Sequence, residues 1–450
     1  MHKRSSSFLA FFICLGILVG LSNCGSNSPD AVFHNGVLAY QDSDPIGASL
    51  YFEDFIKKFP DDERVLTAYQ ALARCYFDMK DFANMRAVFE EMKEKFPDPN
   101  TQITCDFQIG GSYFNEGFYD KAVVKFSEIA DATTNPRIRV QALGNLAGVY
   151  AKQTQSATAQ SYYDQMYKIG ESEVEDATEA LDIKLMALSG KANVLKASSE
   201  FNSARNIYKQ TLDLVADATG ITGIDNDREE AVLNWVNTWK EAGDYITSVT
   251  MYDRIQNHPY IQDKTKPWLI IHKIDDMQML FREKHLEEKS AQNADNDEAS
   301  QENPQPLGFT PQEIAVLVSE NQRLIKDFPE TDFAVNARVS IAQLVKESTP
   351  AEADDYFNEA IEMYEKYITN PPDPQRPLVA LFQIADAYIR FDKLADAKQT
   401  LERIRQSYSQ VPQAMQRVAG MLQFIDSLER ERAKAEEEKN TARAEVSPAT

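Results

Sequence analysis

Side chains suited to catalysis or metal binding are sparse in this sequence of 450 residues, and their spacing is not that of an active site. The acidic runs "IDNDREE" at 224–230 and "NADNDEAS" at 293–300 lack the glycine turn and closing glutamate of a calcium loop, which favours solvated loops. No glycine-rich phosphate loop, nucleophile elbow or paired-cysteine zinc pattern is present. The histidines beyond residue 24 lack a second ligand at metal spacing: His34, His258, His272 and His285. The sequence therefore predicts a protein that is not an enzyme and uses no metal or cofactor.

The first 24 residues have the pattern of an export signal that ends in a modifiable cysteine. Lys3 and Arg4 precede an uninterrupted apolar run over 8–21, which is too short to span a bilayer comfortably. The motif "LSNC" that ends at Cys24 then resembles a bacterial lipobox, where the thiol of the first mature residue is joined to diacylglycerol.

The lipobox resemblance implies a cellular address. It implies a signal peptide over 1–23, a tether over 24–30, and acyl chains such as palmitate on Cys24 that hold the chain in a lipid bilayer. Gly25 stands where inner-membrane lipoproteins carry an acid, so the resemblance favours the outer membrane, with the chain facing the periplasm. A plainly secreted chain is the alternative.

Two cysteines remain after this segment, Cys75 and Cys105. Their positions in the repeat described below differ by seven residues of phase, roughly 10 Å along a helix axis, whereas a disulfide needs Cα atoms within about 7 Å. We expect two buried small hydrophobic side chains. The net charge of −23 argues against nucleic acid or a bare anionic membrane as the main partner.

A repeat of 37 residues organises the chain. "FIKKFPDD" at 55–62 is echoed by "MKEKFPDP" at 92–99 and by "LIKDFPET" at 324–331. Within this frame a small residue such as Gly110 is followed by an aromatic residue, later by an alanine, and finally by a proline that stops the second helix. The aromatic positions are 37 residues apart: Tyr76, Tyr113 and Tyr150.

This order of residues resembles the tetratricopeptide repeat, a pair of antiparallel helices that stacks on its neighbours. The resemblance implies an all-α fold, an α-solenoid of about nine helix hairpins with a C-terminal capping helix. In it, Gly110 marks a close approach of the two helices of one pair, and the three tyrosines fill the space to the next pair.

The predicted solenoid covers 31–286 and 310–411, followed by a capping helix and a charged disordered tail over 412–450. Between the two parts, 287–309 is acidic and almost without apolar side chains, which predicts a disordered loop. We expect this loop to be inserted within one hairpin, because each flank otherwise lacks a partner helix. A linker between two domains is the alternative.

The resemblance also implies a binding face on the first helices of the hairpins, where repeat proteins hold peptides or partner proteins. Gly144 and Gly148 on one helix leave a gap that a ligand backbone fits, although close helix packing explains them equally well. Transferred position by position, the predicted groove residues are Tyr40, Arg74, Phe77, Asp78, Phe107, Phe114, Asn115 and Lys152.

The expected function is a non-catalytic scaffold that binds envelope proteins or peptides. The lipidated cysteine followed by such repeats is similar to the BamD-type lipoproteins of outer-membrane protein assembly. The repeat style is also similar to Tol-Pal-associated periplasmic proteins, which coordinate the cell wall with the envelope. The alternative is a lipoprotein that captures a solute or glycan for an outer-membrane transporter, with an aromatic pocket around Trp235, Trp239 and Trp268.

Overall fold

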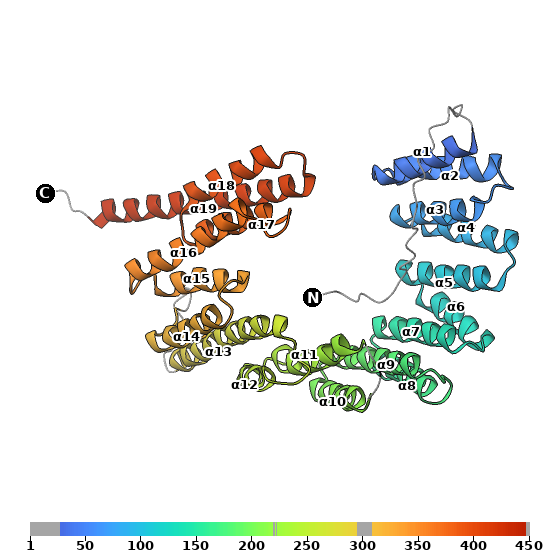
Figure 1. Ribbon diagram of the computed structural model, residues 1–450, viewed down its shortest axis with the longest axis horizontal. Helices are drawn as coiled ribbons and strands as arrows, with labels where there is room; N and C mark the ends of the chain where they lie inside the picture. The colour runs from blue at the N-terminus through green and yellow to red at the C-terminus, as the bar shows by residue number, and fades with distance from the viewer. Residues whose placement is uncertain (1–27, 219–220, 222, 295–307, 447–450) are drawn as a thin grey trace. The chain divides into compact units, whose positions relative to one another are not determined.

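The computed structural model describes residues 28–218, 221, 223–294 and 308–446, and within these ranges the chain is helical and contains no strand (Figure 1). One short 3-10 helix, Asp263–Thr265, precedes α13. The α-helices are α1 (Pro29–Gln41), α2 (Pro45–Lys58), α3 (Val65–Asp78), α4 (Phe82–Lys95), α5 (Pro99–Glu116), α6 (Tyr119–Ala132), α7 (Pro136–Lys152), α8 (Ser156–Ser172), α9 (Ala177–Ala197), α10 (Phe201–Asp217), α11 (Asp225–Glu241), α12 (Tyr245–Ile255), α13 (Lys266–Ala294), α14 (Pro311–Asp327), α15 (Asp332–Val345), α16 (Pro350–Thr369), α17 (Arg376–Arg390), α18 (Leu394–Ser407) and α19 (Pro412–Val446).

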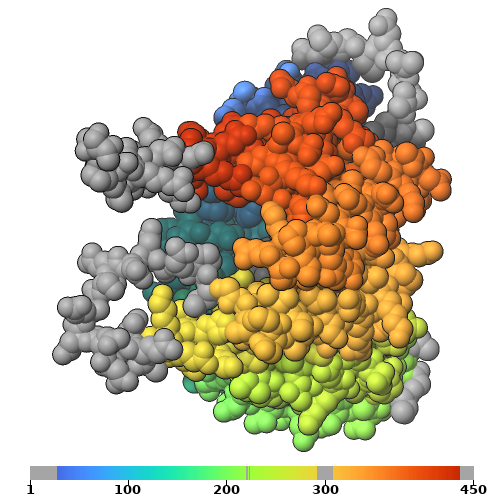
Figure 2. Space-filling view, turned by 90° about the vertical axis from the view of Figure 1, so that its left-hand side faces the viewer, coloured from blue at the N-terminus to red at the C-terminus, as the bar shows by residue number. Residues whose placement is uncertain are grey.

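The helices pair in chain order, and each pair packs on the next within two compact units whose boundary falls after Ile207, inside α10. The first unit stacks α1/α2 to α7/α8 and then α9; the second stacks α11/α12 to α17/α18 and then α19. In Figure 2 the colours from yellow-green to red show the pairs of the second unit in this order. The all-α repeat of nine hairpins with a terminal helix, predicted from the sequence, is therefore confirmed over the described ranges.

A tight turn with one left-handed residue joins the two helices of seven hairpins. In the α3/α4 turn, Lys80 has φ 58°, its N–H donates to the Phe77 carbonyl, and the Asp81 N–H donates to the Tyr76 carbonyl. These two bonds form the Schellman motif, which satisfies the last carbonyls of the first helix. The other left-handed turn residues are Ser43, Gly117, Thr154, Ser199, Gly243 and Asp392.

The repeated Phe-Pro sequence ends the second helix of a hairpin two residues before the proline. The helical region is sterically disfavoured for the residue before a proline, so Phe59, Phe96 and Phe328 leave it in similar conformations, with φ of −127°, −120° and −136° and ψ of 55°, 84° and 53°. Each of the three phenylalanine N–H groups still donates to the carbonyl four residues earlier, which closes the last helical turn.

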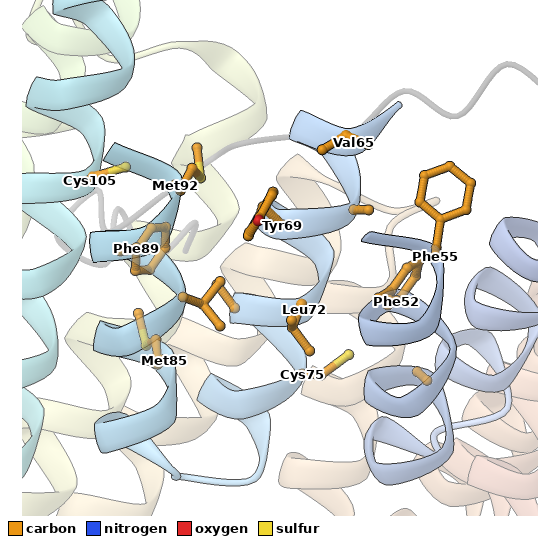
Figure 3. Packing of buried hydrophobic residues seen from close by; sticks show 14 of the residues in the cluster. Phe52, Phe55, Val65, Tyr69, Leu72, Cys75, Met85, Phe89, Met92 and Cys105 are labelled. Atoms are coloured by element: carbon orange, nitrogen blue, oxygen red, sulfur yellow. The ribbon is translucent and has the colours of Figure 1, made fainter. Parts of the chain in front are cut away.

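Close helix contacts occur where the repeat places a small residue. A Cβ atom added to Gly110 would lie 2.7 Å from the ring of Phe126, and one added to Gly36 would lie 2.9 Å from Phe52. Both rings are buried, in the cores of their own hairpins. Figure 3 shows the core around Phe52, to which α2, α3, α4 and α5 contribute. The predicted role of Gly110 is thus confirmed.

The two free cysteines lie in this core. Cys75 and Cys105 are fully buried on α3 and α5, at separate places in the cluster of Figure 3. Burial raises the pKa of each thiol to about 12, so both remain protonated and inert near neutral pH. The expectation of two buried hydrophobic side chains is confirmed.

Two of the repeat tyrosines also contact the preceding hairpin, while Tyr113 packs against the core that includes α7 of the next pair, as expected. The Tyr76 hydroxyl donates to Glu53 of α2, and the guanidinium of Arg86 on α4 lies 4.5 Å from the centre of the Tyr113 ring. Helices α2 and α4 pack directly against α3 and α5, which brings these side chains together.

The structure also corrects three predicted boundaries. Helix α1 begins at Pro29 with Ser28 as its N-cap, so the tether ends there instead of at 30. Residues 287–294, predicted as loop, continue α13, because glutamate, lysine, alanine and glutamine favour helix and no glycine or proline intervenes. The tail predicted as disordered is helical to Val446 for the same reason. Residues 1–27, with Cys24, and residues 295–307 lie outside the described ranges.

Within the described ranges, no helix is both long enough and apolar enough to cross a bilayer.

Candidate partner-binding face

Six of the eight predicted groove residues fall at equivalent places of successive first helices. Tyr40, Phe77 and Phe114 are 37 residues apart, and each lies in the last turn of α1, α3 or α5, before the tight turn. Asp78, Asn115 and Lys152 form a second series at the next position. The Schellman turns end these helices at the same point of the repeat, so both series run along one edge of the first unit.

Three of these residues meet between α1 and α3. The Tyr40 hydroxyl donates to an Asp78 carboxylate oxygen at 2.6 Å, and the Arg74 Nε donates to the Tyr40 hydroxyl oxygen at 3.2 Å. Arg74 also pairs with Asp78, at 3.2 Å. Burial and the hydrogen bond to Asp78 raise the pKa of Tyr40, which therefore remains a neutral donor.

Phe77 extends this cluster with an aromatic surface. Its ring is half-buried and meets Phe82 of α4 edge-on, with the ring centres 6.1 Å apart. The Arg74 guanidinium carbon lies 5.2 Å from the Phe77 ring centre, within the range of a cation–π contact. We call Tyr40, Arg74, Phe77 and Asp78 the Tyr40 cluster. It combines a hydroxyl, a guanidinium, a carboxylate and a ring face at one partly exposed place.

The remaining groove residues are not part of the cluster. Phe114 is half-buried, with its ring centre 5.8 Å from that of Tyr119, while Asn115 and Lys152 are exposed. The structure contradicts the assignment of Phe107, which is 8% exposed and packs against Phe126 with ring centres 6.3 Å apart. A phenyl ring gains more free energy in that hydrophobic core than in a wet groove, so Phe107 is a core residue.

Two glycines of α7 have no close neighbour that explains them. A Cβ atom at Gly144 would make only an ordinary contact of 3.7 Å with Met166, and one at Gly148 would meet nothing within 4 Å among the described residues. Glycine in a helix interior costs about 1 kcal/mol relative to alanine. Of the two explanations open from the sequence, close helix packing therefore does not account for Gly148. Gly148 leaves bare helix backbone one turn before Lys152, which belongs to the second series of groove residues.

A buried polar cluster in the second unit has no signal in the sequence. Asp276 of α13 is fully buried, accepts a hydrogen bond from Ser248 of α12 at 2.6 Å, and pairs with Lys240 of α11 at 2.7 Å. Burial and the charge of Lys240 lower the pKa of the nearby His272 to about 4. The cluster joins α11, α12 and α13, and its carboxylate and hydroxyl are fully buried, while the side chain of Lys240 is 33% exposed.

The tryptophans named for a solute pocket pack into this unit's core. Trp235 and Trp239 meet edge-on with ring centres 5.2 Å apart. The ring centre of Trp268 lies 3.8 Å from that of His272. All three pack against the hydrophobic cluster of α11 and α12. A cavity of about 700 Å³ in the same unit is lined by other residues, from 223–228 and 259–263. Among the described residues, no group of three or more potential metal ligands is present.

Stacked helix hairpins with a partly exposed edge define a class of protein, the helical-repeat scaffolds that bind partner proteins or peptides. The family comparison agrees with this class. Residues 67–99 and 379–410 match the tetratricopeptide repeat family. These segments comprise most of hairpin α3/α4 and most of hairpin α17/α18, one from each unit.

Several solved structures are similar to this chain at low sequence identity. A tetratricopeptide repeat protein from Parabacteroides merdae has 10% sequence identity and a TM-score of 0.35, over 66% of this chain and 92% of that one. PilW, a type IV pilus biogenesis factor, has 16% identity and a TM-score of 0.33, over 53% and 97%. The apo form of RapI has 10% identity and a TM-score of 0.37, over 83% and 98%. No curated protein sequence is significantly similar to this chain.

Proposed function

We propose that this protein is a lipid-anchored, non-catalytic scaffold on the periplasmic side of the outer membrane, where it binds envelope proteins or peptides. Outer-membrane protein assembly and the coordination of cell wall and envelope are the processes that such a scaffold serves. The Tyr40 cluster is the observation that carries the proposal. Aromatic and arginine side chains contribute most to the binding energy of protein interfaces, and here both lie at one partly exposed place.

The chemistry of the cluster suits a segment that carries both charge and apolar surface. Arg74 has a side chain 54% exposed, and Asp78 keeps 30% of its side chain exposed while paired with it. A partner's cation can add to the carboxylate, and an apolar side chain can cover the Phe77 ring. The exposed Asn115 and the bare backbone at Gly148 continue this edge toward α7, and a line of such groups suits an extended peptide or one partner helix.

Photocrosslinking in the native host tests the partner-binding face. A photoreactive amino acid at Asn115 should give an adduct with a partner, because this exposed residue lies one repeat beyond Asp78. The matched control is Glu94, which is exposed on the second helix α4. Combining the Asn115 probe with Arg74→Ala and Phe77→Ala should remove the adduct. Adducts at Glu94 alone, or an Asn115 adduct that survives both substitutions, would contradict the assignment.

Metabolic labelling tests the anchor separately. Radioactive palmitate should enter the native chain and be absent from a Cys24→Ser variant, and the labelled chain should fractionate with the outer membrane. Label that persists in Cys24→Ser, or a native chain that carries none, excludes Cys24 as the anchor. The crosslinking result remains interpretable in either case.

A further inference from the structure

Helix α2 of the first hairpin exposes two large aliphatic side chains on one side. Ile46 is 64% exposed and Leu50 is 62% exposed, and both lie opposite the buried residues Ala48 and Phe52. Their spacing of four residues places them next to each other on the helix surface. Lys57, seven residues after Leu50, is exposed on the same side. The outer side of α2 therefore presents two aliphatic groups in one line, then the acids Glu53 and Asp54, and then the cation Lys57. Asp54 is paired with Lys58 at 2.8 Å.

Stacking of hairpins does not account for this surface. At the equivalent positions, α4 has Ala83 and Ala87, and α6 has Asp120 and Val124. These residues are also exposed, so the outer side of the second helices is not covered by a neighbouring hairpin. Large aliphatic side chains occupy both positions only in the first of these three hairpins. At the equivalent place of α12, Ile246 is 67% exposed but has Thr250 instead of a second aliphatic side chain. The adjacent pair on α2 is therefore a small apolar patch that sets this end of the first unit apart.

The chain that precedes α1 identifies the occupant of this patch. Only five peptide units separate Cys24 from Pro29, the first residue of α1, and a fully extended chain spans at most about 3.6 Å per residue, or about 18 Å in total. An acyl group on Cys24 therefore holds the N-terminal end of α1, in the first hairpin, within that distance of the bilayer surface. No later hairpin is tied to the anchor by so short a segment.

We propose that the outer side of α2, with Ile46, Leu50 and Lys57, rests on the lipid bilayer that holds the acylated Cys24; this inference rests on the anchor of the proposed function. The aliphatic side chains enter the headgroup region, and Lys57 remains with the lipid phosphates. The acidic balance of the chain opposes free association with a membrane, so the contact depends on the tether, which makes it effectively intramolecular. The Tyr40 cluster lies on α1 and α3, so the docked α2 leaves it open to a partner.

The test uses the chain from Cys24 onward, coupled through Cys24 to a maleimide phospholipid in phosphatidylcholine vesicles. Coupling is selective because Cys75 and Cys105 are fully buried. Leu50→Trp reports on the proposed contact, and Val124→Trp is the matched control at the equivalent position two hairpins away, where the side chain is 54% exposed. Emission is compared with that of the parent chain, whose native tryptophans lie in the second unit.

In vesicles of brominated lipid, the added emission of Leu50→Trp should shift to the blue and be quenched, and that of Val124→Trp should not. Adding Ile46→Asp to Leu50→Trp should restore the emission, because an exposed carboxylate opposes entry into the bilayer. Equal quenching at the two positions, or no quenching in Leu50→Trp, overturns the inference. Chemical coupling makes this outcome independent of whether the cell acylates Cys24, which palmitate labelling decides.

Discussion

The Tyr40 hydroxyl of α1 donates a hydrogen bond of 2.6 Å to Asp78 of α3 and so joins two successive hairpins at their tight-turn edge. The contact crosses 38 residues of sequence at a partly exposed place, and Arg74 contacts both partners. The Tyr40 cluster is thus held in shape before any partner arrives, which lowers the entropic cost of binding.

Removing this hydroxyl should loosen the first two hairpins only slightly. Tyr40→Phe should lower the free energy of unfolding by about 0.5–1.5 kcal/mol, the net value of a typical hydrogen bond, and urea unfolding measures it. The same variant should weaken the Asn115 crosslink, because Asp78 and Arg74 lose a fixed neighbour. Tyr119→Phe, on the half-buried tyrosine of α6, serves as a matched control. An unchanged crosslink in Tyr40→Phe would show that the partner does not rely on the cluster's geometry.

Gly148→Ala should stabilise the protein, in contrast to Gly110→Ala. At Gly148 the new methyl group meets open space, and helix propensity gains about 1 kcal/mol. At Gly110 the methyl group would lie 2.7 Å from the Phe126 ring, and overpacking should cost about 1–3 kcal/mol. Thermal unfolding should show a higher Tm for Gly148→Ala and a lower Tm for Gly110→Ala than for the parent chain. If a partner backbone lies on α7, Gly148→Ala should also weaken the Asn115 crosslink while raising stability.

The sequence predicts best those positions where the backbone permits only certain conformations or residue types. Phe59 and Phe96 precede prolines that forbid a further helical turn, and Gly110 has no room for a side chain. These constraints depend on residues close in sequence or at fixed places of the 37-residue repeat, so the repeat was sufficient to predict them.

Side-chain burial depends on contacts that the repeat does not specify. Phe107 occupies a groove position but turns toward Phe126, because its ring is long enough to reach the core. Asp276 and Lys240 look like ordinary surface charges until α11, α12 and α13 are brought together. The cluster of Tyr40, Arg74 and Asp78 was likewise predicted only as separate groove positions, since the bonds between them depend on how α1 stacks against α3.

Replacing a strained turn residue should raise stability. Lys80 has φ 58°, a conformation that costs a residue with a Cβ about 1–2 kcal/mol, while Gly117 holds the equivalent position of the next turn without that cost. Lys80→Gly should therefore stabilise the chain by about 0.5–1 kcal/mol after the added entropy of the unfolded chain is deducted. Gly117→Ala should destabilise it by a similar amount. Calorimetry of both variants checks the pair, and a loss of stability in Lys80→Gly would mean that its side chain makes a contact worth more than the strain.

The buried His272 should make stability depend on pH. Burial and the charge of Lys240 lower the pKa of this imidazole from 6.5 to about 4 in the folded chain, whereas the unfolded chain binds the proton at 6.5. The unfolded state therefore holds more protons between these values, so stability should fall as the pH falls from 6.5 toward 4, by up to about 3 kcal/mol. His272→Phe keeps an aromatic ring against Trp268 and cannot ionise, so its unfolding free energy should lose this part of the pH dependence. His34→Phe, at an exposed position of α1, is the control for replacing an imidazole by a phenyl ring. Urea unfolding of the three chains at pH 7, 6 and 5 measures the difference, and parallel profiles for His272→Phe and the parent would contradict a neutral buried imidazole.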